Sequence, residues 1–305
     1  MASSEFATFR ELVEATRDPT GEADIEAMRR SIERGGGRFP ARTASSPTSI
    51  GGVPGEWVTT VDARDAANDP ASPAMLYLHG GGYVSGSPSS HRNITGTLAT
   101  LVGCAVFVAD YRLAPEDPHP AAVTDAVAVY RALLDAGRRP EQLVIAGDSA
   151  GGGLAMALLL AARDAGLPLP AGAVLISPWV DMEGTGNSIT TRADVDPMIQ
   201  PGMLRQIAAA FLGPDGNPTD PLASPLLAAD LGGLPPTLIH VGDAEVLLDD
   251  ATRLADRLTA AGSPVELAVY PEMIHVWHGA AGFVPEADHA MAAISTFVRP
   301  LLVLS

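Results

Sequence analysis

The sequence contains no lysine, and all 19 of its basic residues are arginines. A chain without lysine cannot form a lysine Schiff base, a P-loop lysine contact to phosphate or a serine–lysine dyad. Acidic residues outnumber basic ones by 36 to 19, which gives a net charge of −17 and disfavours nucleic acid as a partner. These deficits exclude several classes of function before any motif is considered.

Cysteine and long apolar runs are equally scarce. Cys104 is the only cysteine, so the chain can form neither an internal disulfide nor a thiolate metal cluster, and its apolar neighbours indicate a buried, inert thiol. The N-terminus lacks the basic start and apolar stretch of a secretory signal, and no run is long enough to span a membrane. We therefore expect a cytoplasmic protein without stable membrane insertion.

Short apolar runs alternate with helical segments over most of the chain. This order predicts an α/β fold with a mostly parallel central sheet and helices on both faces. The helices are expected near residues 88–101, 119–136, 151–164, 247–261 and 286–298. The runs expected to form strands are Ala74–Leu78, Ala105–Ala109, Leu143–Ala146, Ala173–Ile176, Thr237–Val241 and Val265–Val269.

Two regions depart from this alternation. The first 50 residues contain two amphipathic segments with apolar residues at helical spacing, from Phe6 to Val13 and from Ile25 to Ile32. A long stretch from about Asp181 to Pro235 is rich in glycine, proline and aspartate, with one helix expected around Met203–Leu212. A stretch of that length inside an α/β core is usually a lid or a binding insertion.

A Gly-x-Ser-x-Gly motif at residues 147–151 stands between an apolar run and a long alanine- and leucine-rich segment. This order predicts a strand, a tight turn with Ser149 at its apex, and a helix. The turn leaves little room for side chains, which Gly147 and Gly151 would satisfy, and it would expose the serine Oγ beside the helix N-terminus. The motif favours a nucleophile, although chance is the alternative in a chain with 31 glycines.

Three successive glycines, Gly80, Gly81 and Gly82, follow the predicted strand that ends at Leu78. Glycines at a strand end let backbone N–H groups approach a substrate closely, which suits stabilisation of an oxyanion. A flexible turn or a phosphate loop is the alternative, and the lack of lysine weakens the phosphate interpretation. We expect these three residues, together with Ala150 after the serine, to form an oxyanion hole.

Taken together, three segments of the chain resemble the bacterial hormone-sensitive lipase family of α/β-hydrolase esterases. They are His-Gly-Gly-Gly at 79–82, Tyr-Arg-Leu-Ala-Pro-Glu at 111–116, which is architectural in that family, and Gly-Asp-Ser-Ala-Gly-Gly at 147–152. The resemblance implies an α/β-hydrolase fold with a cap built from N-terminal helices and an insertion. We therefore expect cap helices in 1–50 and a catalytic domain in 51–305, with the cap insertion at about 181–235.

The general base is expected last in the chain, because α/β-hydrolases run in the order serine, acid, histidine. His275 follows the last predicted strand and matches the loop histidine of the family, so we expect it to act as general base and then as general acid. His278 raises the alternative of a metal pair, but no carboxylates or cysteines cluster nearby, and a packing role is expected instead. His79 is expected to anchor the glycine segment.

The acid departs from the pattern of the family, which places Asp-Pro-Leu-x-Asp after the corresponding strand. This chain has Asp-Ala-Glu-Val-Leu-Leu-Asp at residues 243–249. Without a gap, Glu245 falls on the acid position and Asp249 on the second aspartate. We expect Glu245 to orient His275, since glutamate can serve in this role, and Asp243 is the alternative.

These expectations describe a serine carboxylesterase that acts on small-molecule esters through an acyl-enzyme, without a cofactor or a metal. A lactone hydrolase or an amidase would use the same triad, and a non-catalytic binding protein on this fold is a further alternative. The family implies acyl chains of roughly four to eight carbons, held in an apolar covered pocket. An exposed edge strand such as Val265–Val269 could support a homodimer. The apolar residues offered by the expected cap are Phe6, Phe9, Met203, Leu204, Ile207 and Phe211.

Overall fold

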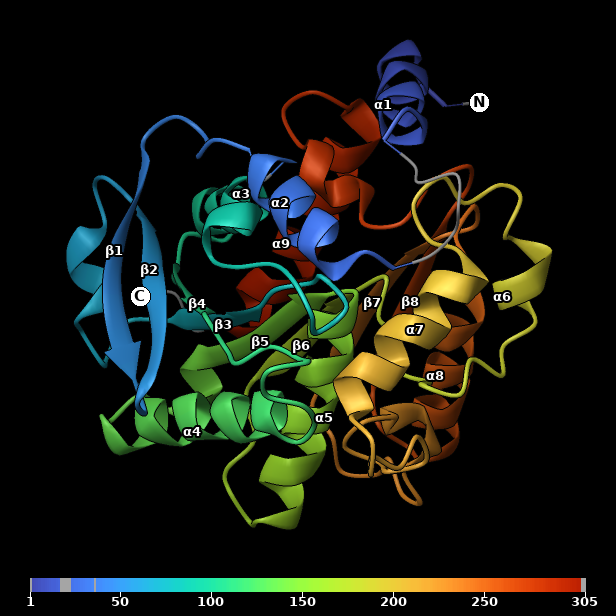
Figure 1. Ribbon diagram of the computed structural model, residues 1–305. Helices are drawn as coiled ribbons and strands as arrows, with labels where there is room; N and C mark the ends of the chain where they lie inside the picture. The colour runs from blue at the N-terminus through green and yellow to red at the C-terminus, as the bar shows by residue number, and fades with distance from the viewer. Residues whose placement is uncertain (1, 17–22, 36, 303–305) are drawn as a thin grey trace.

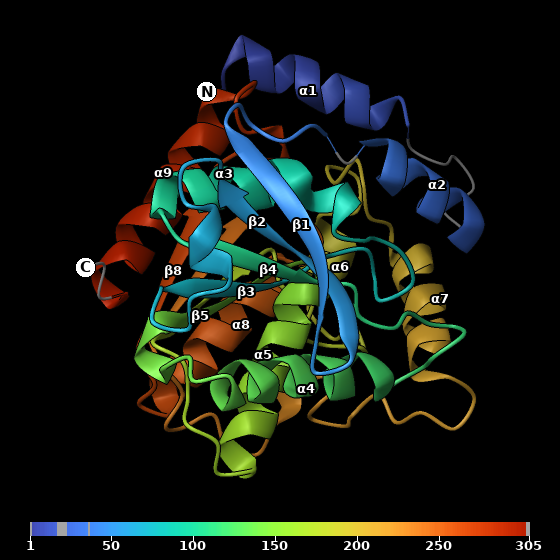
Figure 2. The same cartoon turned by 90° about the vertical axis from the view of Figure 1, so that its left-hand side faces the viewer.

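The computed structural model describes residues 2–16, 23–35 and 37–302, and its helices pack around one eight-stranded sheet (Figures 1 and 2). The strand order is β1-β2-β4-β3-β5-β6-β7-β8. The strands from β3 to β8 run parallel to one another, whereas β1 and β2 form an antiparallel hairpin at one edge. The strands are β1 (Thr43–Ile50), β2 (Val53–Thr60), β3 (Ala74–Leu78), β4 (Ala105–Ala109), β5 (Leu143–Asp148), β6 (Gly172–Ile176), β7 (Thr237–Gly242) and β8 (Val265–Tyr270).

All six predicted strands form, each with bounds within two residues of those expected. Every residue of β3 to β7 is buried, which explains why these strands read as continuous apolar runs rather than as alternating ones. Successive side chains point to opposite faces of the sheet. In β3, Leu76 and Leu78 pack into one core cluster, and Met75 and Tyr77 pack into the other.

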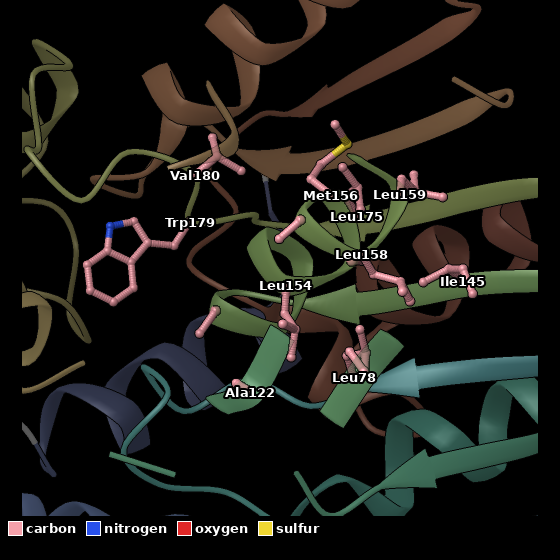
Figure 3. Close-up of a cluster of buried hydrophobic side chains, with 14 of the residues drawn as sticks. Leu78, Ala122, Ile145, Leu154, Met156, Leu158, Leu159, Leu175, Trp179 and Val180 are labelled. Carbon is pink, nitrogen blue, oxygen red and sulfur yellow. The ribbon is translucent and has the colours of Figure 1, made fainter. Parts of the chain in front are cut away.

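Helices cover both faces of the sheet, as the alternation of segments predicts (Figure 1). The face covered by α4, α5 and α8 includes the apolar cluster of Figure 3, in which Leu154 and Leu158 of α5 lie over Leu78 and Ile145 of the sheet. The other face is covered by α3 and α9. The bounds of these helices are α3 (Arg92–Val102), α4 (Ala121–Asp135), α5 (Ala150–Asp164), α8 (Leu248–Ala260) and α9 (Pro285–Leu301).

The β1–β2 hairpin was not predicted, because β1 does not have an apolar sequence. Its residues are mostly polar and are half-buried or exposed, and Pro47 lies within it, as suits a strand at a sheet edge. The hairpin pairs over eight residues, from Thr43 opposite Thr60 to Ile50 opposite Val53. A division of the chain at residue 50 would separate these two strands, so we propose that the N-terminal cap segment ends before Thr43.

The two N-terminal helices attach to the body in different ways. In α1 (Ser4–Glu14), Phe6 is buried in the core cluster that contains Trp277, and the Ser3 N–H and hydroxyl donate to Glu286 at 2.6 and 2.8 Å. In α2 (Ile25–Gly35) no described side chain is fully buried, but Ile25 and Met28 pack half-buried against the other core cluster, and the helix also makes polar contacts. Figures 1 and 2 both place α2 beside α7 (Pro201–Leu212), the helix expected in the insertion.

The polar contacts of α2 reach the segment that follows the three glycines. The Arg29 guanidinium donates to the carbonyls of Val84 and Ala114 at 2.8 and 3.0 Å, and it pairs with Glu116 at 2.6 Å. No helix within the described ranges is both long enough and apolar enough to cross a bilayer. The remaining short helices are η1 (Arg64–Ala67), η2 (Ser89–His91), η3 (Pro140–Gln142), α6 (Ser188–Thr191), η4 (Pro225–Leu227) and η5 (Trp277–Ala280).

Candidate active site

Ser149 stands at the turn between β5 and α5, where the sequence predicts it. Its backbone is strained, with φ 55° and ψ −123°. A side chain at Gly147 would lie 2.2 Å from the Gly151 carbonyl oxygen, and one at Gly151 would lie 2.0 Å from that of Leu78. The prediction that both flanking positions must lack side chains is therefore confirmed.

The residues from His79 to Tyr83, which we call the glycine loop, follow β3 next to this turn. The loop is held by the ring of His79, which lies 2.8 Å from the Gly80 carbonyl and stacks on Tyr111 at 4.3 Å between ring centroids. The Tyr111 hydroxyl donates to the His79 carbonyl at 2.6 Å. His79 thus anchors the loop as the sequence predicts, and burial lowers its pKa to about 3, which keeps the ring neutral.

Asp148, directly before Ser149, connects the turn to the glycine loop. Its carboxylate accepts from the Tyr77 hydroxyl at 2.6 Å and from the Gly80 N–H at 3.1 Å, and it lies 3.3 Å from Nε2 of His91. Burial lowers the pKa of His91, but the charge and hydrogen bond of Asp148, with smaller contributions from Ser87 and Glu33, together leave that pKa above its ordinary value. In return, His91 and Tyr77 hold the pKa of Asp148 at about 2 in spite of its burial. The buried pair therefore favours the ionised form of both partners.

His275 and Glu245, far apart in the sequence, meet at the carboxyl ends of β7 and β8. Nδ1 of His275 lies 3.2 Å from Oε1 of Glu245, and both side chains are buried. Burial lowers the pKa of His275, but the hydrogen bond and charge of Glu245 raise it to a net value above the ordinary one. Asp243 lies elsewhere: its half-buried carboxylate accepts from the Glu272 N–H at 2.7 Å. Of the two candidate acids, the fold brings only Glu245 to the histidine.

Ser177 supports this pair, although no motif in the sequence singles it out. Its hydroxyl donates to Oε2 of Glu245 at 2.8 Å and accepts from the Val276 N–H at 3.3 Å. The Gly242 N–H donates to the same carboxylate oxygen at 3.1 Å. Ser177 directly follows β6, beside the strand that carries Ser149. A polar residue at the end of a neighbouring parallel strand is the signal that could have identified it.

The long insertion packs over the glycine loop. Phe211 of α7 stacks on Tyr83 with 3.9 Å between ring centroids, and Ile207 lies against Gly82. These two side chains and Leu204 are buried, as is Phe6 on α1, whereas Met203 and Phe9 are only partly buried. A small recess at the base of the insertion is lined by Trp179, Asp181, Met182, Glu183, Gly184, Ile189, Pro201, Leu204 and Arg205.

The second histidine of the last loop has a packing role. Nε2 of His278 lies 3.1 Å from Nδ1 of His240, both rings are buried, and the ring of Trp277 packs on His278. Burial lowers the pKa of both histidines, to about 4 for His240, so the pair is neutral. Within the described ranges no group of three or more histidine, cysteine, aspartate or glutamate side chains is placed to hold a metal ion.

Burial also raises the pKa of Cys104 to about 12, which makes its thiol inert, as expected.

A protein-family model described as the alpha/beta hydrolase fold matches residues 75–279. An acetyl-hydrolase of Streptomyces hygroscopicus is 44% identical over 301 residues, which cover 98% of this chain and 97% of that protein.

Two solved structures are similar over nearly their whole length. A crystal structure of an esterase from the bacterial hormone-sensitive lipase family superposes with a TM-score of 0.91 at 44% identity, covering 99% of this chain and 100% of the other. A crystal structure of EstE5, soaked with p-nitrophenyl butyrate, superposes with a TM-score of 0.91 at 43% identity and covers 98% and 99% of the two chains. The similarity thus includes the cap segments as well as the sheet.

Proposed function

Because the chain belongs to the bacterial hormone-sensitive lipase family of α/β-hydrolase esterases, we propose that it hydrolyses short- to medium-chain carboxylic esters through an acyl-enzyme formed on Ser149. It is a carboxylic ester hydrolase, like its named relatives. The observation that carries the mechanism is the 3.2 Å contact between His275 and Glu245, together with the strained turn at Ser149.

In this mechanism His275 first accepts a proton from Ser149 and then donates it to the leaving alcohol. With its Nδ1–H directed to Glu245, Nε2 keeps the lone pair that accepts the Ser149 proton as Oγ attacks the ester carbonyl. The tetrahedral intermediate collapses, the alcohol leaves with the proton from His275, and the acyl group stays on Ser149. Water then repeats the sequence and releases the acid. Glu245 orients the ring and stabilises its cationic form.

The oxyanion requires N–H donors that have no other partner. The N–H of Gly80 already donates to Asp148, so we assign this glycine to support of the loop. Gly81 and Gly82 follow it with positive φ angles, and Ala150 is the first residue of α5, whose N–H has no acceptor within the helix. We therefore propose that Gly81, Gly82 and Ala150 donate to the oxyanion, each worth roughly a hundredfold to a thousandfold in rate.

The preference for short or medium acyl chains rests on the packing of the cap. Phe211 and Ile207 of the insertion lie buried against the glycine loop, which limits the space above it. The soak of the similar EstE5 used a butyrate ester. We propose acyl chains of roughly four to eight carbons, because a ligand pocket must enclose most of its ligand.

A series of p-nitrophenyl esters of increasing acyl length tests this preference. We expect kcat/KM to be highest between butyrate and octanoate and to fall for longer chains. A maximum at dodecanoate or beyond would contradict the proposal. Lactones and anilides of the best acyl group, assayed beside the ester, separate the alternatives of lactone hydrolase and amidase, which use the same intermediates.

We further propose that two copies pair through β8. This strand lies at the edge of the sheet, and Val269 is 43% exposed on it. Light scattering on the purified chain should give the mass of a dimer, and Val269→Lys should shift it to that of a monomer. A monomeric mass for the unaltered chain at micromolar concentration would overturn this proposal.

A further inference from the structure

A second buried carboxylate, Asp196, borders the turn that carries Glu245. This turn, residues 243–247, which we call the acid turn, joins β7 to α8. Asp196 belongs to the cap insertion and is fully buried. Its Oδ2 accepts from the N–H of Val246, the residue directly after Glu245, at 2.9 Å. The cap insertion therefore touches the acid turn with a carboxylate, about 50 residues away in the sequence.

The hydrogen bonds of Asp196 suit an ionised carboxylate. Oδ1 accepts from the N–H groups of Met198 and Ile199 at 2.8 and 2.9 Å, so three N–H groups in all point at the two oxygens. An ionised carboxylate is an acceptor only, whereas a protonated one would need an acceptor for its O–H. A fully buried negative charge is costly unless a cation lies nearby. The imidazolium of His275, formed during turnover, would supply that cation.

Two residues of the cap insertion bind the backbone N–H and the backbone carbonyl of Val246 in the acid turn. Asp196 binds the Val246 N–H, and the Ser188 hydroxyl donates to the Val246 carbonyl at 2.6 Å. Ser188 and Asp249 add a reciprocal pair, in which each N–H donates to the other side chain, at 3.0 and 2.9 Å. Glutamate has one more rotatable bond than aspartate, so the backbone that carries Glu245 gains from being fixed in this way.

We propose that Asp196 is a positioning residue for His275: it fixes the acid turn through Val246 and places a second negative charge beside the imidazolium that forms during turnover. The inference rests on the proposed roles of Ser149, Glu245 and His275. It gives the cap insertion a part in the proton transfer, in addition to any contact with substrate.

The groups around His275 support this assignment. The titratable side chains whose charge acts on it are Glu245 from the acid turn, Asp196 from the cap insertion, Asp148 from the end of β5 and His278 from η5. After burial, Glu245 has the largest effect on the pKa of His275, and Asp196 comes next and also raises it. For Asp196, burial leaves the pKa above its ordinary value, while the charge of His275 and the three backbone N–H donors act against that rise. The charges of Asp196 and His275 thus each favour the charged form of the other.

The test replaces Asp196 and follows His275 directly. In the full-length protein, Asp196→Asn removes the charge but keeps the size of the side chain. We expect the pKa of His275, measured by NMR of its ring, to fall by about 0.5 to 1 unit, because a nearby anion that favoured the cation is gone. The acidic limb of the kcat/KM profile should move to lower pH by the same amount. Above that limb kcat should fall about 3- to 10-fold with little change in KM, because a weaker base accepts the proton less readily.

Ser188→Ala is the matched control, since it releases the other side of Val246 and leaves the charge in place. It should lower the melting temperature but leave the pKa of His275 unchanged. If the Asn variant does not fold, Asp196→Ser is measured by the same criterion. An unchanged His275 pKa in whichever variant folds would overturn the inference, as would an equal shift in Ser188→Ala.

Failure of the proposed function has a different signature. If Ser149→Ala retains turnover, the triad assignment fails whatever happens to the ring. The NMR resonance of His275, assigned by its disappearance in His275→Asn, reports the effect of Asp196 without reference to activity. If Ser149→Ala loses turnover but the pKa of His275 is unchanged in Asp196→Asn, only the role of Asp196 is rejected.

Discussion

The carboxylate of Asp148 accepts the N–H of Gly80 at 3.1 Å, so the residue before Ser149 holds the first glycine of the loop that faces it. Asp148 is the last residue of β5, and Gly80 lies just after the neighbouring parallel strand β3. Because His91 pairs with the same carboxylate, its charge is compensated without a partner in the substrate site. The turn and the glycine loop are therefore built as one unit.

Asp148→Asn should weaken both stability and turnover. The pKa of Asp148 is held at about 2, below its ordinary 3.8, so its stabilising effect is present above about pH 4 and is lost as pH falls toward 2. Its loss should cost roughly 2 kcal/mol near pH 5 and flatten the acid dependence of stability between pH 4 and 2. The raised pKa of His91 adds stability at low pH that fades as pH rises through that pKa. Unfolding by denaturant across pH 2–7 measures both effects, and equal slopes in variant and parent would contradict the pairing.

Alanine substitutions in the glycine loop should differ in severity. At Gly80 a Cβ would lie 2.2 Å from Oδ2 of Asp148 and 3.0 Å from its backbone carbonyl. Gly80→Ala should therefore displace the loop that carries the N–H groups of Gly81 and Gly82, and reduce kcat by more than about a hundredfold, the effect of losing one oxyanion donor. At Gly82 the nearest atom is Cγ2 of the Ile207 side chain, at 2.9 Å. Adding Ile207→Ala should restore part of the activity of Gly82→Ala and none of that of Gly80→Ala. If Ile207→Ala restored the activity of Gly80→Ala and Gly82→Ala equally, the loss at Gly80 would come from contact with the cap and not from contact with Asp148.

Glu245→Gln and Asp243→Asn separate the two candidate acids. Because Glu245 contacts His275, its amide should leave the ring in the wrong tautomer and lower kcat by about 10⁴-fold, the size of loss seen when a triad acid is replaced by its amide. Asp243→Asn removes only the charge of a carboxylate that binds the Glu272 N–H and should keep kcat within about threefold. Circular dichroism confirms folding in both. Our assignment is wrong if the Asp243 change alone abolishes turnover.

Asp250→Asn should stabilise the protein at neutral and alkaline pH. Asp250 is fully buried in α8, and burial raises its pKa to about 8, with Asp181 adding to the rise. The folded chain keeps a proton that the unfolded chain releases, so the stability from this group falls as pH rises from about 4 to about 8. The advantage of the variant should grow by up to about 1.4 kcal/mol per pH unit in that window.

Calorimetry of Asp250→Asn and of Asp256→Asn, an exposed position on the same helix, checks this prediction. The control should follow the parent at every pH. A constant difference between Asp250→Asn and the parent from pH 5 to pH 8 would mean that Asp250 is ionised in the folded protein.

The sequence predicts the core of the fold because local pattern and global packing agree there. The parallel strands β3 to β7 are buried on both faces, and the helices between the strands carry apolar stripes, so both signals are strong. The β1–β2 hairpin escaped prediction because Pro47 and a row of polar residues suit only an edge strand. Its pairing with β4 through β2 is a tertiary contact that no local pattern reveals.

The candidate site divides in the same way. Ser149, the glycines and His275 stand in short motifs whose chemistry is readable, and Glu245 follows from its position in one of them. Asp196 and Ser177 have no motif, since their roles depend on which loops meet at the ends of β6 and β7. For such residues the fold had to be known first.

Covalent labelling of Ser149 tests the central claim most directly. The full-length protein is treated with a fluorophosphonate and its intact mass is measured, beside Ser149→Ala and Ser177→Ala, with ester hydrolysis followed in parallel. We expect one label per chain on Ser149 in the parent and in Ser177→Ala, no label in Ser149→Ala, and a loss of kcat of about 10⁶-fold in that variant. A label on another residue, or undiminished turnover by Ser149→Ala, would contradict the assignment of Ser149 as the nucleophile.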